Sequence, residues 1–171
     1  MAKYLKSNPV GIDKQLNRLQ EHLYDGLGYA DFNSYGRAYL LKNSENQIVP
    51  HRYLEGSEGD YEEILYDDTL NGLSFILDSD ETSPFSGVYM QTQISIVMMF
   101  DLEKLKPSVV HVADEEIRNE VISVLERFRY FTITNIVKNE EALSDFETDL
   151  EAIHPRFFLK ITGNIKYQFN C

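Results

Sequence analysis

Histidine is the residue type in this chain best suited to metal binding or proton transfer, but its spacing argues against both roles. The histidines lie far apart and match no ligand pattern such as His-Glu-x-x-His, and the sequence has no Cys-x-x-Cys pair. We therefore expect no metal site. Each histidine is interpreted as a surface or hydrogen-bonded core residue: His22, His51, His111 and His154.

Other short motifs that could support chemistry are incomplete. Asp78-Ser79-Asp80 begins like a calcium loop but lacks the glycine and the terminal glutamate of an EF-hand. Gly26-x-Gly28 lacks the preceding strand and the third glycine of a phosphate-binding loop, and no Gly-x-Ser-x-Gly elbow is present. The sole cysteine, Cys171, has no partner for an intrachain disulfide. We expect no catalytic residue, no bound cofactor and no enzymatic activity; an enzyme of unrecognised type would need a cleft of converging polar groups that no spacing indicates.

The net charge of −12 is distributed unevenly. Ten carboxylates and no lysine or arginine lie between Glu55 and Glu81, and residues 140–151 form a second acidic cluster without a basic residue. Like charges at this density hold a segment in solvent, so two solvated loops are one interpretation. The other is an acidic surface that meets a basic partner or keeps a polyanion from binding. The candidate residues for this surface are Glu55, Glu58, Asp60, Glu140, Glu141 and Asp145.

Length and composition indicate one domain spanning residues 1–171. A hydrophobic fraction of 43% is enough for a core, and no apolar run is long enough to cross a membrane. The N-terminus lacks the apolar stretch of a signal peptide, so a cytoplasmic protein is the default expectation. We expect residues 1–7 to be flexible and residues 55–62 and 78–87 to be exposed acidic loops.

The first element is predicted to be a helix that begins at Asn8 and Pro9 and is stopped by Gly26 and Gly28. Its apolar stripe has about one residue per turn, which suits a helix lying on a surface. That stripe could pack on the chain's own sheet or on a neighbouring subunit. Its candidate interface residues are Leu16, Leu19 and Leu23.

The remaining elements follow from periodicity and turn composition. A tyrosine-rich hairpin is predicted over 34–41 and 48–54, and 73–77 is a short buried strand or a helical turn. Beyond these we predict a long strand at 87–100, a helix at 114–128, strands at 131–137 and 157–169, and an acidic loop or short helix at 139–149.

These elements predict an α+β fold with a mixed, mainly antiparallel sheet and two main helices packed on it. The strand 87–100 would span more than about 40 Å, long enough to form half of a projecting β-hairpin. Such a strand could pair with a neighbouring subunit by β-augmentation. Its polar face supplies further candidate interface residues: Tyr89, Gln91, Gln93 and Ser95.

The order of these elements resembles the tail-terminator and related neck-ring proteins of tailed bacteriophages. The resemblance covers most of the chain and rests on Pro9–Leu23 as the first helix, Gln91–Phe100 as the central strand, Ile117–Phe128 as the helix crossing the sheet and Phe157–Phe169 as the closing strand. No diagnostic motif accompanies it, and the long acidic segment from Glu55 to Glu81 departs from the shorter family members.

The resemblance implies a virion protein, assembled in the bacterial host cytoplasm, that forms a closed ring, commonly a hexamer, at the head–tail joint. Its partners would be further copies of itself and neighbouring neck, connector or tail-tube proteins, and genome DNA would pass through the lumen without specific binding. Carboxylates facing that lumen would repel the DNA phosphates. The alternative is an acidic regulatory or inhibitory protein, for example a DNA mimic that binds a basic partner with salt-sensitive affinity.

Overall fold

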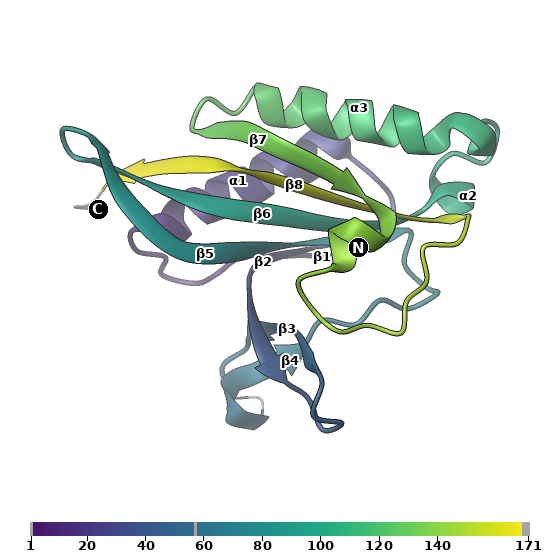
Figure 1. The fold of residues 1–171 in the computed structure, drawn as a ribbon, viewed down its shortest axis with the longest axis horizontal. Helices are drawn as coiled ribbons and strands as arrows, with labels where there is room; N and C mark the ends of the chain where they lie inside the picture. The colour runs from purple at the N-terminus through teal and green to yellow at the C-terminus, as the bar shows by residue number, and fades with distance from the viewer. Residues whose placement is uncertain (1, 57, 169–171) are drawn as a thin grey trace.

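A single twisted sheet organises the molecule, which we describe from a computed structural model covering residues 2–56 and 58–168, without the side chain of Glu58. The strand order is β4-β3-β2-β5-β6-β8-β7, with β1 beside β2 (Figure 1). The β1–β2 and β2–β5 pairs are parallel and the other pairs are antiparallel. The expected α+β class with a mainly antiparallel mixed sheet is therefore confirmed.

The chain contains the following strands and helices. The strands are β1 (Ala2–Tyr4), β2 (Phe32–Lys42), β3 (Ile48–Tyr53), β4 (Tyr61–Glu63), β5 (Gly72–Ser86), β6 (Tyr89–Asp101), β7 (Phe131–Lys138) and β8 (Arg156–Gln168). The α-helices are α1 (Ile12–Leu27), α2 (Leu102–Leu105) and α3 (Ala113–Glu126), and short 3-10 turns are η1 (Glu58–Asp60), η2 (Val110–Val112) and η3 (Asn139–Leu143).

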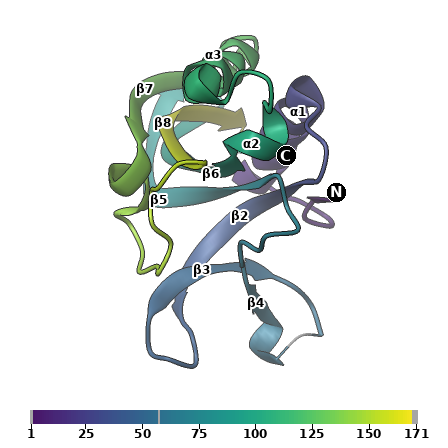
Figure 2. The same ribbon diagram turned by 90° about the vertical axis from the view of Figure 1, so that its right-hand side faces the viewer.

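Helices α1 and α3 lie side by side on one face of the sheet (Figures 1 and 2). The strict two-residue alternation of β6 places Ile94, Ile96, Met98 and Phe100 against them, and all four are buried. The opposite face holds a second core around Val97, Met99, Phe75 and Phe158. It is covered by the segment after β7, whose buried residues are Ala142, Leu143 and Phe146.

The first helix is confirmed, but its start was predicted three residues too early. It begins at Ile12 after Gly11, and Asn8 adopts a positive φ of 49° and provides no cap. Gly26 lies inside the last turn. The helix ends at Gly28, whose left-handed backbone (φ 62°) lets its N–H donate to the Tyr24 carbonyl.

The predicted flexibility of residues 1–7 is wrong for the part of this segment that the structure describes. Residues Ala2–Tyr4 pair with β2 as β1, and the Gln20 side-chain amide donates to the Tyr4 carbonyl over 3.0 Å. The Asn17 amide likewise donates to the Lys6 carbonyl over 2.9 Å. Backbone pairing and two amide side chains on α1 therefore hold this segment in place, a pattern that composition does not reveal.

The two predicted loops are also partly wrong. Residues 78–87 are mostly strand, because β5 continues to Ser86 while its backbone pairs with β6 as far as Ser86 and Tyr89. The side chains from Asp80 to Ser86 are nevertheless exposed. In the range 55–62, β4 begins at Tyr61 and pairs with β3, and Ser57 lies outside the described residues.

The β5–β6 hairpin extends past the ends of both helices at one end of the sheet (Figure 1). The strand predicted at 73–77 is the buried first third of β5. The hairpin predicted at 34–41 and 48–54 is β2–β3, and the strands predicted at 131–137 and 157–169 are β7 and β8. Phe169, the predicted end of the last strand, lies outside the described residues.

Candidate functional site

The three leucines predicted as a candidate subunit interface belong instead to the core. Leu16, Leu19 and Leu23 are 1%, 0% and 3% exposed and lie in the cluster between the helices and β6. A narrow stripe suffices to bury this helix because α3 and the sheet enclose it from two sides. These residues cannot contact a partner in the folded chain, so this part of the interface prediction is wrong.

The β-augmentation prediction for the strand 87–100 is also wrong. β6 pairs with β5 on one side and with β8 along its whole length on the other, from Tyr89–Gln168 to Asp101–Arg156. Both rows of its backbone groups are therefore occupied. Within the described residues the edges of the main strand order are β4 and β7.

The polar side chains of β6 remain candidate interface residues, because a partner could contact the sheet face on which they lie even though both strand edges are paired. Gln93 is exposed, and Tyr89, Gln91 and Ser95 are half-buried on the sheet face opposite the helices. Their register partners on β8 are also polar: Gln168, Lys166, Asn164 and Thr162. Among the described residues, the segment that covers this face packs against its other half, around Val97 and Met99. The interface prediction for these four residues stays a prediction.

The acidic candidates occupy two neighbouring segments of the surface. Glu55 and Asp60 are exposed at the end of β3, whereas the side chain of Glu58 lies outside the described part of the chain. Glu140, Glu141 and Asp145 are exposed on the segment that follows β7. That segment docks on the β2–β3 hairpin, where Ile48 and Glu147 exchange two hydrogen bonds of 2.6 and 2.9 Å.

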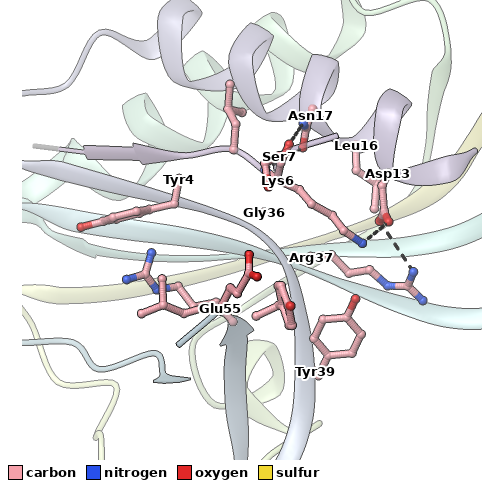
Figure 3. A pocket seen from close by; sticks show the side chains of 14 residues that line it. Tyr4, Lys6, Ser7, Asp13, Leu16, Asn17, Gly36, Arg37, Tyr39 and Glu55 are labelled. Carbon is pink, nitrogen blue, oxygen red and sulfur yellow. Dashed lines mark hydrogen bonds and ion pairs between the residues drawn. The ribbon is translucent and has the colours of Figure 1, made fainter. Parts of the chain in front are cut away.

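A cleft that the sequence did not predict lies between the N-terminal segment, α1, β2 and the end of β3 (Figure 3). Its volume is about 340 Å³. The carboxylate of Asp13, a residue only 6% exposed, points into it. Asp13 accepts a short hydrogen bond from the Lys6 ammonium, and one Arg37 nitrogen lies 3.7 Å from its other oxygen.

The charges in this cleft neutralise one another. Arg37 also pairs with Asp78 at 3.1 Å and with Asp80 at 3.2 Å, so it joins α1 to the β5–β6 hairpin. The Arg52 guanidinium lies 4.1 Å from the ring centroid of Tyr4 and pairs with Glu62. Each cation is thus committed to a carboxylate, and we interpret the cleft as the junction that fixes the N-terminal segment rather than as a reaction centre.

Tyr29 has the most strongly perturbed environment of the described titratable groups, and its role is structural. Burial and the hydrogen bond that its hydroxyl donates to Glu120 raise the pKa of Tyr29 well above its usual range. Glu120 also accepts from Lys106, so three segments meet at this carboxylate. The neutral Tyr29 hydroxyl donates to the Glu120 carboxylate and so stabilises the contact between the turn after α1 and α3.

No group of three or more His, Cys, Asp or Glu side chains that could hold a metal ion occurs among the described residues. None of the described helices is long and apolar enough to span a membrane. No protein-family model and no curated protein sequence matches this chain.

Proposed function

We propose that this chain is a structural subunit that forms a ring at the head–tail joint of a tailed bacteriophage, as a tail terminator or a neck or tail-completion protein. The observation that supports this most is the half-covered sheet. Residues Tyr89–Ser95 of β6 present a polar face, and at the hairpin tip Phe85 and Val88 are 50% and 58% exposed. Exposed apolar residues beside an open sheet face mark a surface that a partner would cover.

The charge supports a lumen that is permissive to DNA. Exposed carboxylates gather on residues 55–68 and 139–151, and a net charge of −12 repels a phosphate backbone. Six copies would strengthen that field. In this proposal the copies bind one another and neighbouring neck, connector or tail-tube proteins.

Electron microscopy of the purified full-length chain tests this proposal. We expect closed rings of one size with an open centre. The double variant Phe85→Ser/Val88→Ser should lose rings while keeping the thermal unfolding midpoint of the wild type, because both side chains are exposed. Its matched control is Leu65→Ser, which alters a similarly exposed apolar residue (64%) in the loop between β4 and β5, away from the hairpin tip. Single particles of monomer size under all conditions would contradict the proposal.

One observation favours a second candidate, an acidic protein that binds a basic partner as a DNA mimic. The carboxylates of residues 140–151 stand on a segment fixed by buried Leu143 and Phe146, so they form a pre-ordered anionic surface. This candidate predicts a monomer or dimer that binds a basic protein with salt-sensitive affinity. Closed rings in the micrographs would argue against it.

A further inference from the structure

Six lysine and arginine side chains of this acidic chain form no ion pair with a carboxylate among the described residues. They are Lys14, Arg18, Lys42, Arg127, Arg129 and Lys166. Lys42 lies at the end of β2 and Arg127 directly follows α3, whereas the other four lie close together. Lys14, Arg18 and Arg129 are exposed and Lys166 is half-buried.

Four of these six cations gather at one small cleft, which we call the basic cleft. Lys14, Arg18 and Lys166 line it together with Tyr130, against whose ring the Arg129 guanidinium packs at 4.7 Å. Its volume is about 110 Å³, comparable to a few water molecules at about 30 Å³ each. The cleft therefore has room for one or two small anionic groups.

The other lining groups are also suited to an anion. Gln15 lines the basic cleft and is only 6% exposed, yet its side-chain amide nitrogen has no hydrogen-bond partner in the described residues. Helix α1 begins at Ile12, and its N-cap residue Gly11 provides no side-chain cap, so the N–H groups of the first turn add partial positive charge. The Lys166 ammonium lies 3.9 Å from the centroid of the Phe85 ring, so it stands beside the hairpin tip.

The acidic segment 139–151 lies at the other end of the same two strands. β7 begins directly after Tyr130 and ends directly before Asn139, while β8 begins near the acidic segment and ends at the basic cleft (Figure 1). Eight residues of strand separate the two surfaces by roughly 25 Å at about 3.3 Å per residue. The two surfaces cannot meet within one molecule, but a rigid strand pair fixes their relative position.

The acidic segment offers carboxylates that are free to pair. Glu140, Glu141, Asp149 and Glu151 are exposed and form no ion pair with any described residue. The segment is ordered beforehand by its buried residues, so binding would cost little conformational entropy.

We propose that the basic cleft of one copy binds the acidic segment 139–151 of the next copy, which rests on the proposed ring-forming function. Two unlike surfaces on one rigid body make a heterologous contact, which closes into a ring when the rotation allows. Two chains of net charge −12 repel each other less where opposite charges face each other, and these unpaired groups supply both signs. A nucleic acid fits less well, because its extended phosphate backbone needs a longer basic track and meets the repulsion of the whole chain.

Charge reversal with a matched control tests this contact. Lys14→Glu reverses an exposed lysine of the basic cleft, and Lys42→Glu makes the same charge change at an exposed lysine on the β2–β3 hairpin. In sedimentation equilibrium at low salt, Lys14→Glu should raise the dissociation constant for self-assembly about tenfold or more, and Lys42→Glu should leave it within about twofold. Lys14→Glu should still fold, since an acidic residue suits the first turn of a helix.

A second reversal identifies the occupant. Glu141→Lys alone should weaken assembly as Lys14→Glu does, and the chain with both changes should recover, because each contact then pairs the same two positions with their charges exchanged. Wild-type rings together with unchanged assembly of Lys14→Glu would overturn this inference alone. Failure of Glu141→Lys either to weaken assembly or to rescue Lys14→Glu would also overturn it.

The remaining outcomes separate this inference from its alternatives. A wild-type chain that never assembles would overturn the proposed function and this inference with it. A short DNA duplex that binds the wild type but not Lys14→Glu, while assembly is unaffected, would assign the basic cleft to phosphates and overturn the inference.

Discussion

At the scale of single residues, Gly163 shows most clearly how closely the strands approach. A Cβ atom at this position would lie 2.4 Å from the Thr132 carbonyl oxygen and 2.6 Å from the Phe131 ring. The oxygen belongs to the backbone of β7, which pairs with β8 here beside a register shift. The contact therefore cannot be relieved by rotation of a side chain.

We predict that Gly163→Ala destabilises the fold by about 1–3 kcal/mol, the usual cost of overpacking. Urea unfolding followed by circular dichroism measures this change. Asn164→Ala, at the next and half-buried position, serves as the control and should cost less than about 0.5 kcal/mol. Equal stabilities of Gly163→Ala and the wild type would contradict the close approach.

Tyr66 makes the free energy of unfolding depend on pH in the alkaline range. Burial, followed by the nearby Asp101 carboxylate, raises the pKa of Tyr66 from 10.0 to about 12. The folded chain then keeps this proton where the unfolded chain loses it. The stabilisation is fully present below about pH 10 and is lost as the pH rises towards the folded pKa.

We therefore predict that the free energy of unfolding falls less steeply for Tyr66→Phe than for the wild type between about pH 9 and about pH 11. Denaturant titrations at several pH values measure both slopes. Identical slopes would show that the folded and unfolded states bind this proton equally.

The residues of the basic cleft illustrate what sequence reasoning could not find. Lys14, Arg18, Arg129 and Lys166 come from α1, from the turn before β7 and from β8, so no local pattern joins them. Asp13 and Arg37 in the larger cleft are equally distant in sequence. The acidic candidates, by contrast, were visible as runs, because consecutive carboxylates without a cation indicate exposure whatever the fold.

At the scale of elements, periodicity predicted the segments whose two faces differ in polarity. The alternation of β6 and of β8, and the helical stripe of α3, each place apolar residues on a buried face. The second half of β5 has no such signal, because its side chains are exposed and include Pro84 and several carboxylates. It is a strand because β6 supplies backbone hydrogen bonds, which composition does not encode.

The stripe of α1 had two interpretations, and its burial decides between them. We predict that Leu19→Ala lowers the free energy of unfolding by about 2–5 kcal/mol, the usual cost of truncating a buried leucine. The loss should be independent of protein concentration, since Leu19 packs within its own chain. Full stability of the dilute variant, with a defect only in assembly, would restore the interface interpretation.

At the scale of the whole molecule, an acidic surface and a basic surface lie at opposite ends of the sheet. The acidic segment 139–151 and the basic cleft lie at opposite ends of the β7–β8 pair, and the hairpin tip with Phe85 and Val88 lies at the same end of the sheet as the basic cleft (Figure 1). A ring of such subunits would pair the basic cleft with the acidic segment 139–151 of a neighbour and leave the carboxylates of residues 55–68 at the surface. Assembly held by these contacts should weaken as salt screens them.

Light scattering of the full-length chain at low and high salt tests the central claim of self-assembly most directly. We predict one discrete oligomer of ring size at low salt that dissociates as the ionic strength rises. A monomeric mass at every protein concentration and salt concentration would contradict the account.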